Sequence, residues 1–303
     1  MKIGAGMPMH ARRSNVAECS DGERTKRRAG VLLPLAVASA TALLAITLIT
    51  TPASGQLHTD RILRTSGDVR LTFTPRSNVC GDGGPIIRVT GPDGQARVHF
   101  RDGRTRINSS NTDEWTSECI SGPVRVTLTV ASGRVRDVRT YVGGSWRNSD
   151  RVTADLGRVA APTAADVLLA LAKRSHDSAH ALLFAATLAD SSNVDQELLE
   201  MARDPTIRIE VRRAAVLWAS LSASDVASSG LREIIDSEDD FEVRKHAVFA
   251  LSQMPRDQAV PALIDIVRKR GDRRIVKQAV FWLGQTNDPR AIALFEELLL
   301  TRK

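Results

Sequence analysis

The sequence contains few of the residues that usually carry chemistry. Only three of its 303 residues are cysteines, six are histidines and 4% are aromatic. Its glycine-rich stretch, Cys80-Gly-Asp-Gly-Gly84, lacks the Lys-Ser/Thr end of a phosphate-binding loop, and a strand rather than a helix is predicted after it. Gly143-Gly-Ser-Trp146 likewise lacks the second glycine of a nucleophile elbow. We therefore predict no catalytic residue and no cofactor.

The formal net charge of +7 is unevenly distributed along the chain. Residues 1–55 carry +4, residues 56–160 carry +5 and residues 161–303 carry −2. A nucleic-acid-binding protein needs a basic stripe, usually interleaved with aromatic side chains, and no such stripe is present. We therefore do not expect nucleic acid as a partner.

Residues 31–49 form the longest apolar run, 19 residues without a charge. Lys26, Arg27 and Arg28 precede it, and this positive flank is expected to stay in the cytoplasm. Ala53 and Gly55 suit signal-peptide cleavage, but the run exceeds the roughly 7 to 15 apolar residues of a usual signal. Residues 1–55 are therefore predicted to be a cytoplasmic n-region followed by a signal peptide or a membrane anchor. In either case the rest of the chain is exported, as a periplasmic or membrane-anchored protein.

Cys80 and Cys119 are the only cysteines beyond this leader. In an oxidising compartment they are expected to form one disulfide, which would stabilise the fold by about 4 kcal/mol on the chain-entropy model. The alternative is two free buried thiols. A zinc site is not favoured, because two thiols without a nearby histidine make half of one.

Residues 56–158 show the alternation of apolar and polar residues that is typical of half-buried strands. Strands are predicted over residues 69–74, 86–90, 96–101, 124–130 and 135–142, with glycine turns between them. We expect a small antiparallel β-sandwich or barrel of about five to seven strands. Six arginines are expected on its solvated side: Arg70, Arg88, Arg97, Arg125, Arg136 and Arg139.

Residues 161–303 contain a repeat, in which Ala215, Ala247 and Ala279 recur at a spacing of 32. A first helix near residue 163 precedes helix pairs at 179–188 with 195–202, 208–222 with 226–236, 241–254 with 258–269, and 273–286 with 289–301. One pair alone leaves an apolar face exposed, so stacking of the pairs is required. The fold class is thus α+β in separate domains, with a C-terminal α-solenoid.

Two stretches carry a family resemblance, VRKHAVFALSQMPRDQAVPALIDIVR from residue 243 and IVKQAVFWLGQTNDPRAIALFEELL from residue 275. They resemble the short bacterial HEAT repeats of phycobilisome-lyase-like proteins. Together with the leader, VCGDG and YVGG, the chain also looks like exported bacterial HEAT-repeat proteins. The resemblance implies a scaffold that holds a protein partner.

Some HEAT-repeat proteins are iron-dependent deoxyhypusine hydroxylases, whose repeats present His-Glu pairs. This chain has no His-Glu dipeptide, and His246 aligns with Ala214 and Gln278. His176 and His180 have the i, i+4 spacing of metal ligands but lack an evident third ligand, so we predict no metal site. Acidic residues gather at 236–242, where we expect a solvated loop, with calcium or a basic partner as the alternative.

In HEAT stacks the second helices usually line the concave face. Seven charged residues there are the candidate partner-binding residues: Arg232, Glu233, Asp265, Arg268, Lys269, Glu296 and Glu297. Their mixed signs favour a protein partner. Trp218 and Trp282 occupy one repeat position and are expected to pack between neighbouring units.

These observations favour a non-enzymatic protein-protein interaction scaffold in the bacterial cell envelope. The alternative is an enzyme or ligand-binding protein, possibly metal-dependent, with its site in the β domain or at the junction of the domains.

Overall fold

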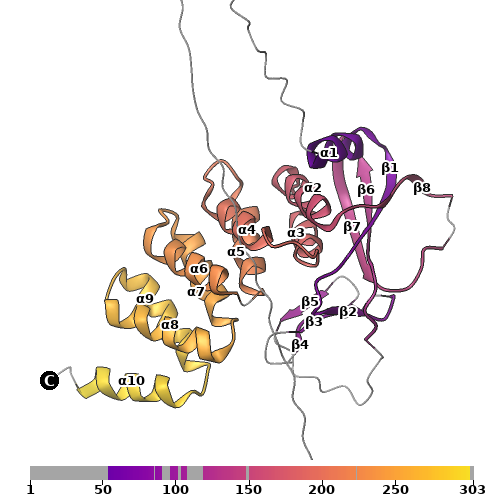
Figure 1. Ribbon diagram of the computed structural model, residues 1–303. Helices are drawn as coiled ribbons and strands as arrows, with labels where there is room; N and C mark the ends of the chain where they lie inside the picture. The colour runs from indigo at the N-terminus through magenta and orange to yellow at the C-terminus, as the bar shows by residue number, and fades with distance from the viewer. Residues whose placement is uncertain are drawn as a thin grey trace, which may run out of the picture. The chain divides into compact units, whose positions relative to one another are not determined.

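The computed structural model describes residues 54–84, 86–90, 96–101, 104–107, 119–147, 150–222 and 224–300. Within these ranges two four-stranded sheets precede a series of helices (Figure 1). The first sheet has the order β7-β6-β1-β8 and consists of β1 (Gly67–Phe73), β6 (Val124–Ala131), β7 (Arg134–Val142) and β8 (Val152–Arg158). The second has the order β2-β3-β4-β5 and consists of β2 (Val79–Gly81), β3 (Ile87–Thr90), β4 (Ala96–Arg101) and β5 (Arg104–Ile107).

The first sheet follows the alternation read from the sequence. Val69 lies opposite Leu128 and Leu71 opposite Val126, and all four side chains are buried on one face. Such cross-strand apolar pairs stabilise a sheet and set its register.

The predicted all-antiparallel sheet is corrected in one respect, because β8 runs parallel to β1. The chain leaves β7 at one edge of the sheet and returns as β8 at the opposite edge, so the sheet is mixed. Alternation of side chains predicts a strand but carries no information on its direction. The short strands β2 and β5, together with β8, were not predicted as separate elements.

The helices agree closely with the predicted pairs. After α1 (Ser54–Arg64), which was not predicted, come α2 (Ala161–Arg174) and eight helices in four pairs. The pairs are α3 (Ala179–Thr187) with α4 (Val194–Arg203), α5 (Ile209–Ser220) with α6 (Asp225–Ser237), α7 (Phe241–Ser252) with α8 (Arg256–Lys269), and α9 (Arg273–Gly284) with α10 (Pro289–Leu300). Pro205, Pro255 and Pro289 lie at helix boundaries, as expected for residues without a backbone N–H.

Successive pairs stack on one another, first helix against first helix (Figure 1). We call α3, α5, α7 and α9 the first-helix layer, and α4, α6, α8 and α10 the second-helix layer. Ala215, Ala247 and Ala279 are fully buried at one position of the first-helix layer. Small side chains at this position leave room for the close packing of neighbouring helices.

The predicted boundary at residues 158–161 lies within continuous packing. One buried apolar core extends from Ile62 in α1 through the first sheet to Leu294 in α10. Ser178 donates a hydrogen bond to the carbonyl of Val135 in β7 (3.1 Å), and Arg76 pairs with Asp195 in α4 (3.2 Å). The arrangement in separate domains is therefore not confirmed, and what changes at this position is the type of secondary structure.

In the described part of the chain, no helix combines the length and apolarity needed to cross a bilayer. The apolar run at 31–49, predicted to be a signal or an anchor, lies outside the described residues.

Candidate interaction surface

The candidate partner-binding residues lie on three consecutive helices of the second-helix layer. Arg232 and Glu233 are on α6, Asp265, Arg268 and Lys269 on α8, and Glu296 and Glu297 on α10. The structure brings six of these seven into ion pairs between neighbouring helices, which the sequence did not predict. The pairs are Arg203 with Glu233 (2.7 Å), Arg232 with Asp265 (3.5 Å), Lys269 with Asp236 (2.8 Å) and Arg268 with Glu297 (3.0 Å).

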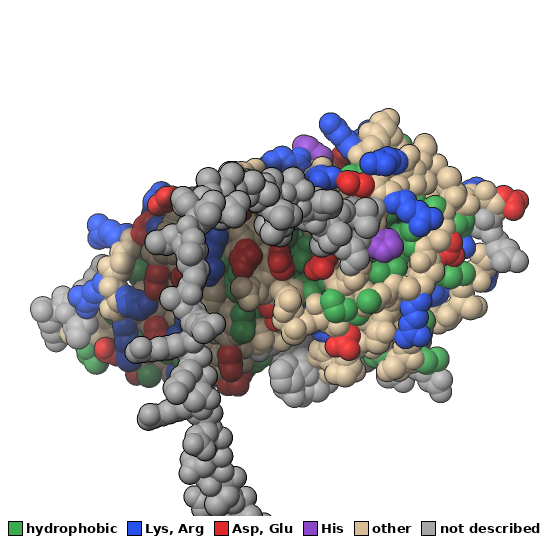
Figure 2. Space-filling model, turned by 45° about the horizontal axis from the view of Figure 1, so that its top comes forward, with side chains coloured by type: hydrophobic (Ala, Val, Ile, Leu, Met, Phe, Trp, Pro, Cys, Tyr) green, Lys and Arg blue, Asp and Glu red, His purple; other side chains and the backbone are tan. Residues whose placement is uncertain are grey.

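We call these four pairs the charge ladder. Its side chains remain between 34% and 64% exposed, so water screens each pair. A pair of this kind contributes roughly 0–1 kcal/mol to stability. Figure 2 shows side chains of both signs intermixed at the solenoid end of the molecule, at the left of the view. The ladder therefore offers alternating charge at a small cost of rearrangement.

Arg203 and Asp236 belong to the ladder but were missed as candidates. Their separations from their partners are 30 and 33 residues, close to the repeat spacing. A search for opposite charges one repeat apart on second helices would have found both.

A second set of contacts joins the two layers. The buried Arg212 donates to the carbonyl of Ala202 (2.8 Å) and to Glu238 (2.6 Å). One unit later, Arg244 donates to the carbonyl of Ile235 (2.8 Å) and to Asp272 (3.2 Å). Each arginine thus connects the end of the previous unit to the segment that leads to the next one, which is Glu238 after α6 for Arg212 and the cap of α9 for Arg244.

These contacts account for most of the acidic cluster at 236–242. Asp236 pairs with Lys269 and Glu238 with Arg212, and Asp240 accepts from the backbone N–H of Glu242 (2.8 Å) as the cap of α7. Glu242 lies 3.4 Å from Lys245. The cluster therefore serves helix capping and the joining of units.

The tryptophans pack between units, as the sequence predicts. Trp218 is fully buried and its ring lies 5.0 Å from that of Phe184 in the preceding unit. Trp282 repeats the arrangement with Phe249 at 5.1 Å. Both are structural contacts within the first-helix layer.

The two histidines with metal-ligand spacing serve different contacts. His176 is exposed and hydrogen-bonded to its neighbour Asp177 (2.7 Å), whereas the ring of His180 meets Trp218 edge-on at 4.8 Å. Within the described ranges no three His, Cys, Asp or Glu side chains are grouped so that they could hold a metal ion.

His246, in α7, has the most perturbed histidine environment. Burial lowers the pKa of His246 to about 4, and the nearby cations Arg213 and Lys245 act in the same direction. The imidazole is therefore neutral at pH 7 and presents no charge to a binding partner.

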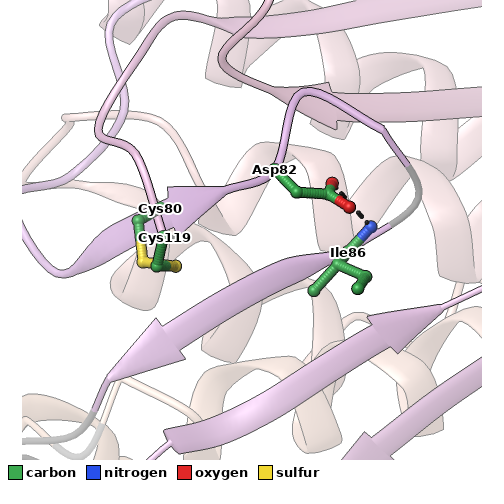
Figure 3. Close-up of a disulfide and its surroundings, with 4 residues drawn as sticks. All are labelled: Cys80, Asp82, Ile86 and Cys119. Atoms are coloured by element: carbon green, nitrogen blue, oxygen red, sulfur yellow. Dashed lines mark hydrogen bonds between the residues drawn. A yellow bond between two sulfur atoms is a disulfide. The ribbon is translucent and has the colours of Figure 1, made fainter. Parts of the chain in front are cut away.

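The structure joins Cys80 and Cys119 in a disulfide, with Cα atoms 5.3 Å apart (Figure 3). Beside it Gly81 and Ile120 exchange two backbone hydrogen bonds, at 3.1 and 2.9 Å. In the adjoining turn the Asp82 carboxylate accepts from the N–H of Gly84 (2.8 Å) and of Ile86 (3.1 Å). The glycine-rich stretch is thus a turn, as expected, with its polar groups already satisfied within the chain.

Arg125, expected on the solvated side of the sheet, is instead 5% exposed. Its guanidinium donates to the carbonyls of Gly143 (2.7 Å), Ser145 (2.9 Å) and Gly83 (2.9 Å). Burial lowers the pKa of Arg125 below its usual value. The three carbonyls belong to turns far apart in the sequence, so this side chain connects the turn after β2 to the segment after β7.

Trp146 completes this cluster. The guanidinium groups of Arg70 and Arg125 lie 4.5 and 5.1 Å from the centre of its indole ring. Such contacts contribute about 0.5–2 kcal/mol each, depending on desolvation. Together with the three carbonyls, they explain why the Arg125 side chain is tolerated inside this part of the fold.

Comparison with known proteins agrees with the repeat geometry. Residues 228–303 match the family of HEAT repeats. This stretch covers most of α6 and the last two helix pairs, and it supports HEAT-type repeats there. No curated protein matches the chain.

Proposed function

We propose that the protein is a non-enzymatic interaction module of the bacterial cell envelope, whose helix pairs hold a protein partner. HEAT repeats generally mediate contacts between proteins, and residues 228–303 match this family. Stacked repeats present an extended surface to a partner.

The charge ladder is the observation that carries this proposal. It places exposed groups of both signs on a layer of helices whose buried faces are tightly packed. Alternating charge gives specificity, because a wrong partner meets like charges. Since each pair contributes little to stability, a partner's charges can replace the internal partner at small cost.

Two features support the envelope location. The apolar run at 31–49 follows three basic residues, the pattern of an export signal or anchor. The Cys80–Cys119 disulfide suits an oxidising compartment. We also propose that residues 31–49 attach the protein to the membrane if this segment is not cleaved.

The Arg268–Glu297 pair provides the test. The single variants Arg268→Glu and Glu297→Arg are expected to reduce partner capture from an envelope extract of the native host by about tenfold. The double variant restores an ion pair of inverted order. It should regain the wild-type urea midpoint yet capture no better than the single variants, because the charges presented to the partner are reversed.

The Lys173–Glu197 pair supplies a matched control, since it is also exposed and joins two helices, and neither residue belongs to the ladder. Inverting it should leave capture unchanged. Wild-type capture by the Arg268/Glu297 double variant would show that the ladder is only structural. Stoichiometric zinc or iron in the purified chain would contradict the non-enzymatic proposal.

A further inference from the structure

The last helix pair exposes a concentration of large apolar side chains. Phe281, Ile292, Leu299 and Leu300 are 53%, 54%, 72% and 73% exposed. Within the described ranges six large hydrophobic residues are exposed, and these are four of them. Terminal units of a solenoid usually carry a polar outer face, and apolar patches of this kind mark interfaces.

The repeat register shows what normally covers this surface. Phe184, Leu217, Phe249 and Phe281 occupy one position in the four units. Phe184 packs on Trp218 of the next unit and is 1% exposed, and Phe249 packs on Trp282. Phe281 has no following unit in the described chain to pack on. The exposed surface of Phe281 therefore corresponds to the surface that packs against the next unit at Phe184 and Phe249.

A further unit of the same kind is not the favoured occupant. Inner units reach forward through Arg212 and Arg244, which bind acidic residues in the segments that lead to the next unit. These are Glu238, which follows α6, and Asp272, which caps α9. The equivalent residue of the last unit is Val276, half-buried and unable to form such a pair. The end of the stack therefore has the apolar part of an inter-unit surface without its polar connection.

The charges around this surface are complementary to one another. The exposed side of α9 carries Arg273 and Lys277, and α9 contains no acidic residue. On α10 the exposed Glu296 lies on the same side as Ile292 and Leu299, at spacings of four and three residues. We call this surface the end face: Val276, Val280, Phe281, Ile292 and Leu299, with Lys277 and Glu296.

We propose that the end face binds a second copy of this chain about a two-fold axis. A two-fold axis brings the same surface of both copies together, so apolar residues meet apolar residues. With the axis between α9 and α10 and along their length, α9 of each copy faces α10 of the other, and Glu296 then lies opposite Lys277. The same charged contact then occurs twice, and the exposed aromatic and aliphatic side chains of both copies are removed from water.

The test is the mass of the full chain in sedimentation velocity, in a density-matched non-ionic detergent over a dilution series. The wild type should sediment at twice the mass of one chain. Ile292→Glu, Lys277→Glu and Glu296→Lys should each weaken the dimer by about tenfold or more. The double variant Lys277→Glu/Glu296→Lys should recover the wild-type dimer, because the pair is restored in the opposite sense.

Val226→Glu is the matched control, because Val226 is 53% exposed on α6 and lies outside the end face. It should dimerise like the wild type, and all variants should keep the wild-type circular dichroism. A wild type that is monomeric at every concentration overturns the proposal. A charge-swapped variant that stays monomeric also overturns it. So does a monomeric wild type that binds a different protein, if the end-face variants no longer bind that protein. None of these results bears on the charge ladder, so the two proposals fail separately.

Discussion

At the scale of single residues, burial decides roles that residue type leaves open. Arg125 is one of six arginines at polar positions of the strands, yet it is buried while Arg136 and Arg139 are exposed. Its neighbours are glycine turns, whose backbone carbonyls approach the guanidinium closely because no side chain intervenes. Nothing in the alternation pattern distinguishes it from the exposed arginines.

Arg125→Met should lower the free energy of unfolding by about 2–4 kcal/mol, measured by urea denaturation. The methionine keeps most of the apolar stem, but three carbonyls lose their donor, one of them buried and two partly buried. Arg136→Met, at an exposed position of β7, is the control and should cost less than about 0.5 kcal/mol. Equal effects of the two variants would show that the Arg125 contacts carry no stability.

His246→Gln should remove part of the acid sensitivity of the fold. The pKa of His246 is about 4 in the native state, against about 6.5 for an ordinary histidine. Between these values the unfolded chain binds the extra proton, so the free energy of unfolding of the wild type falls as pH decreases from about 6.5 to about 4. Desolvation is the main cause, with Arg213, Lys245 and His180 adding to it and Glu242 opposing.

The expected difference is about 1–2 kcal/mol between pH 7 and pH 4, reduced for the partial exposure of the ring. It is measured as the change with pH in the stability gap between His246→Gln and the wild type. Glutamine already occupies the equivalent position 278, so the packing should be maintained. His176→Gln, which also removes one imidazole, controls for general effects. A stability gap that is the same at both pH values would contradict the assignment.

At the scale of elements, the helices were more predictable than the strands. A helix is a local structure, and the 32-residue register together with prolines at boundaries placed all four pairs within a few residues. The first sheet depends in addition on the pairing of β1 with strands far along the chain, such as Asp68 with Thr129 in β6 and Asp68 with Val152 in β8. The direction of β8 and the presence of α1 follow from these distant contacts and could not be read from local patterns.

The disulfide between β2 and Cys119 should stabilise the sheet region. Replacing both cysteines by serine should lower the free energy of unfolding by about 3–4 kcal/mol, because a crosslink between residues 39 positions apart restricts the unfolded chain. The measurement is urea denaturation with and without reductant, and Cys19→Ser is the control. Protein alkylated on isolation from the native host should show Cys80 and Cys119 unmodified. Complete alkylation of both would contradict the proposed oxidising location.

The candidate surface likewise has one feature that the sequence predicts and one that depends on tertiary packing. The sequence predicted which helices carry the exposed charges, because burial on a helix follows its period. The pairing of Arg268 with Glu297, or of Lys269 with Asp236, depends on how far one helix is displaced along the next. That displacement arises from the packing of apolar side chains beneath the charges.

At the scale of the whole molecule, export is the central expectation. Alkaline phosphatase, which needs disulfides formed outside the cytoplasm, should be active when fused after residue 303 and inactive when fused after residue 28. The measurement is phosphatase activity per unit of fusion protein in whole cells of a bacterial host. An inactive, intact fusion at residue 303 would contradict export of the repeats.

The sequence by itself determined the repeat, the helix pairs and the positions of the packing tryptophans, and it predicted the pairing of the two cysteines. Each of these depends on local periodicity or on a count of residues. Only the tertiary structure decided that Arg125 is buried, that β8 runs parallel to β1, that six of the seven candidate charges form ion pairs with neighbouring helices, and that the last described unit leaves Phe281 exposed. These features depend on which distant surfaces meet, and packing of the whole core settles that.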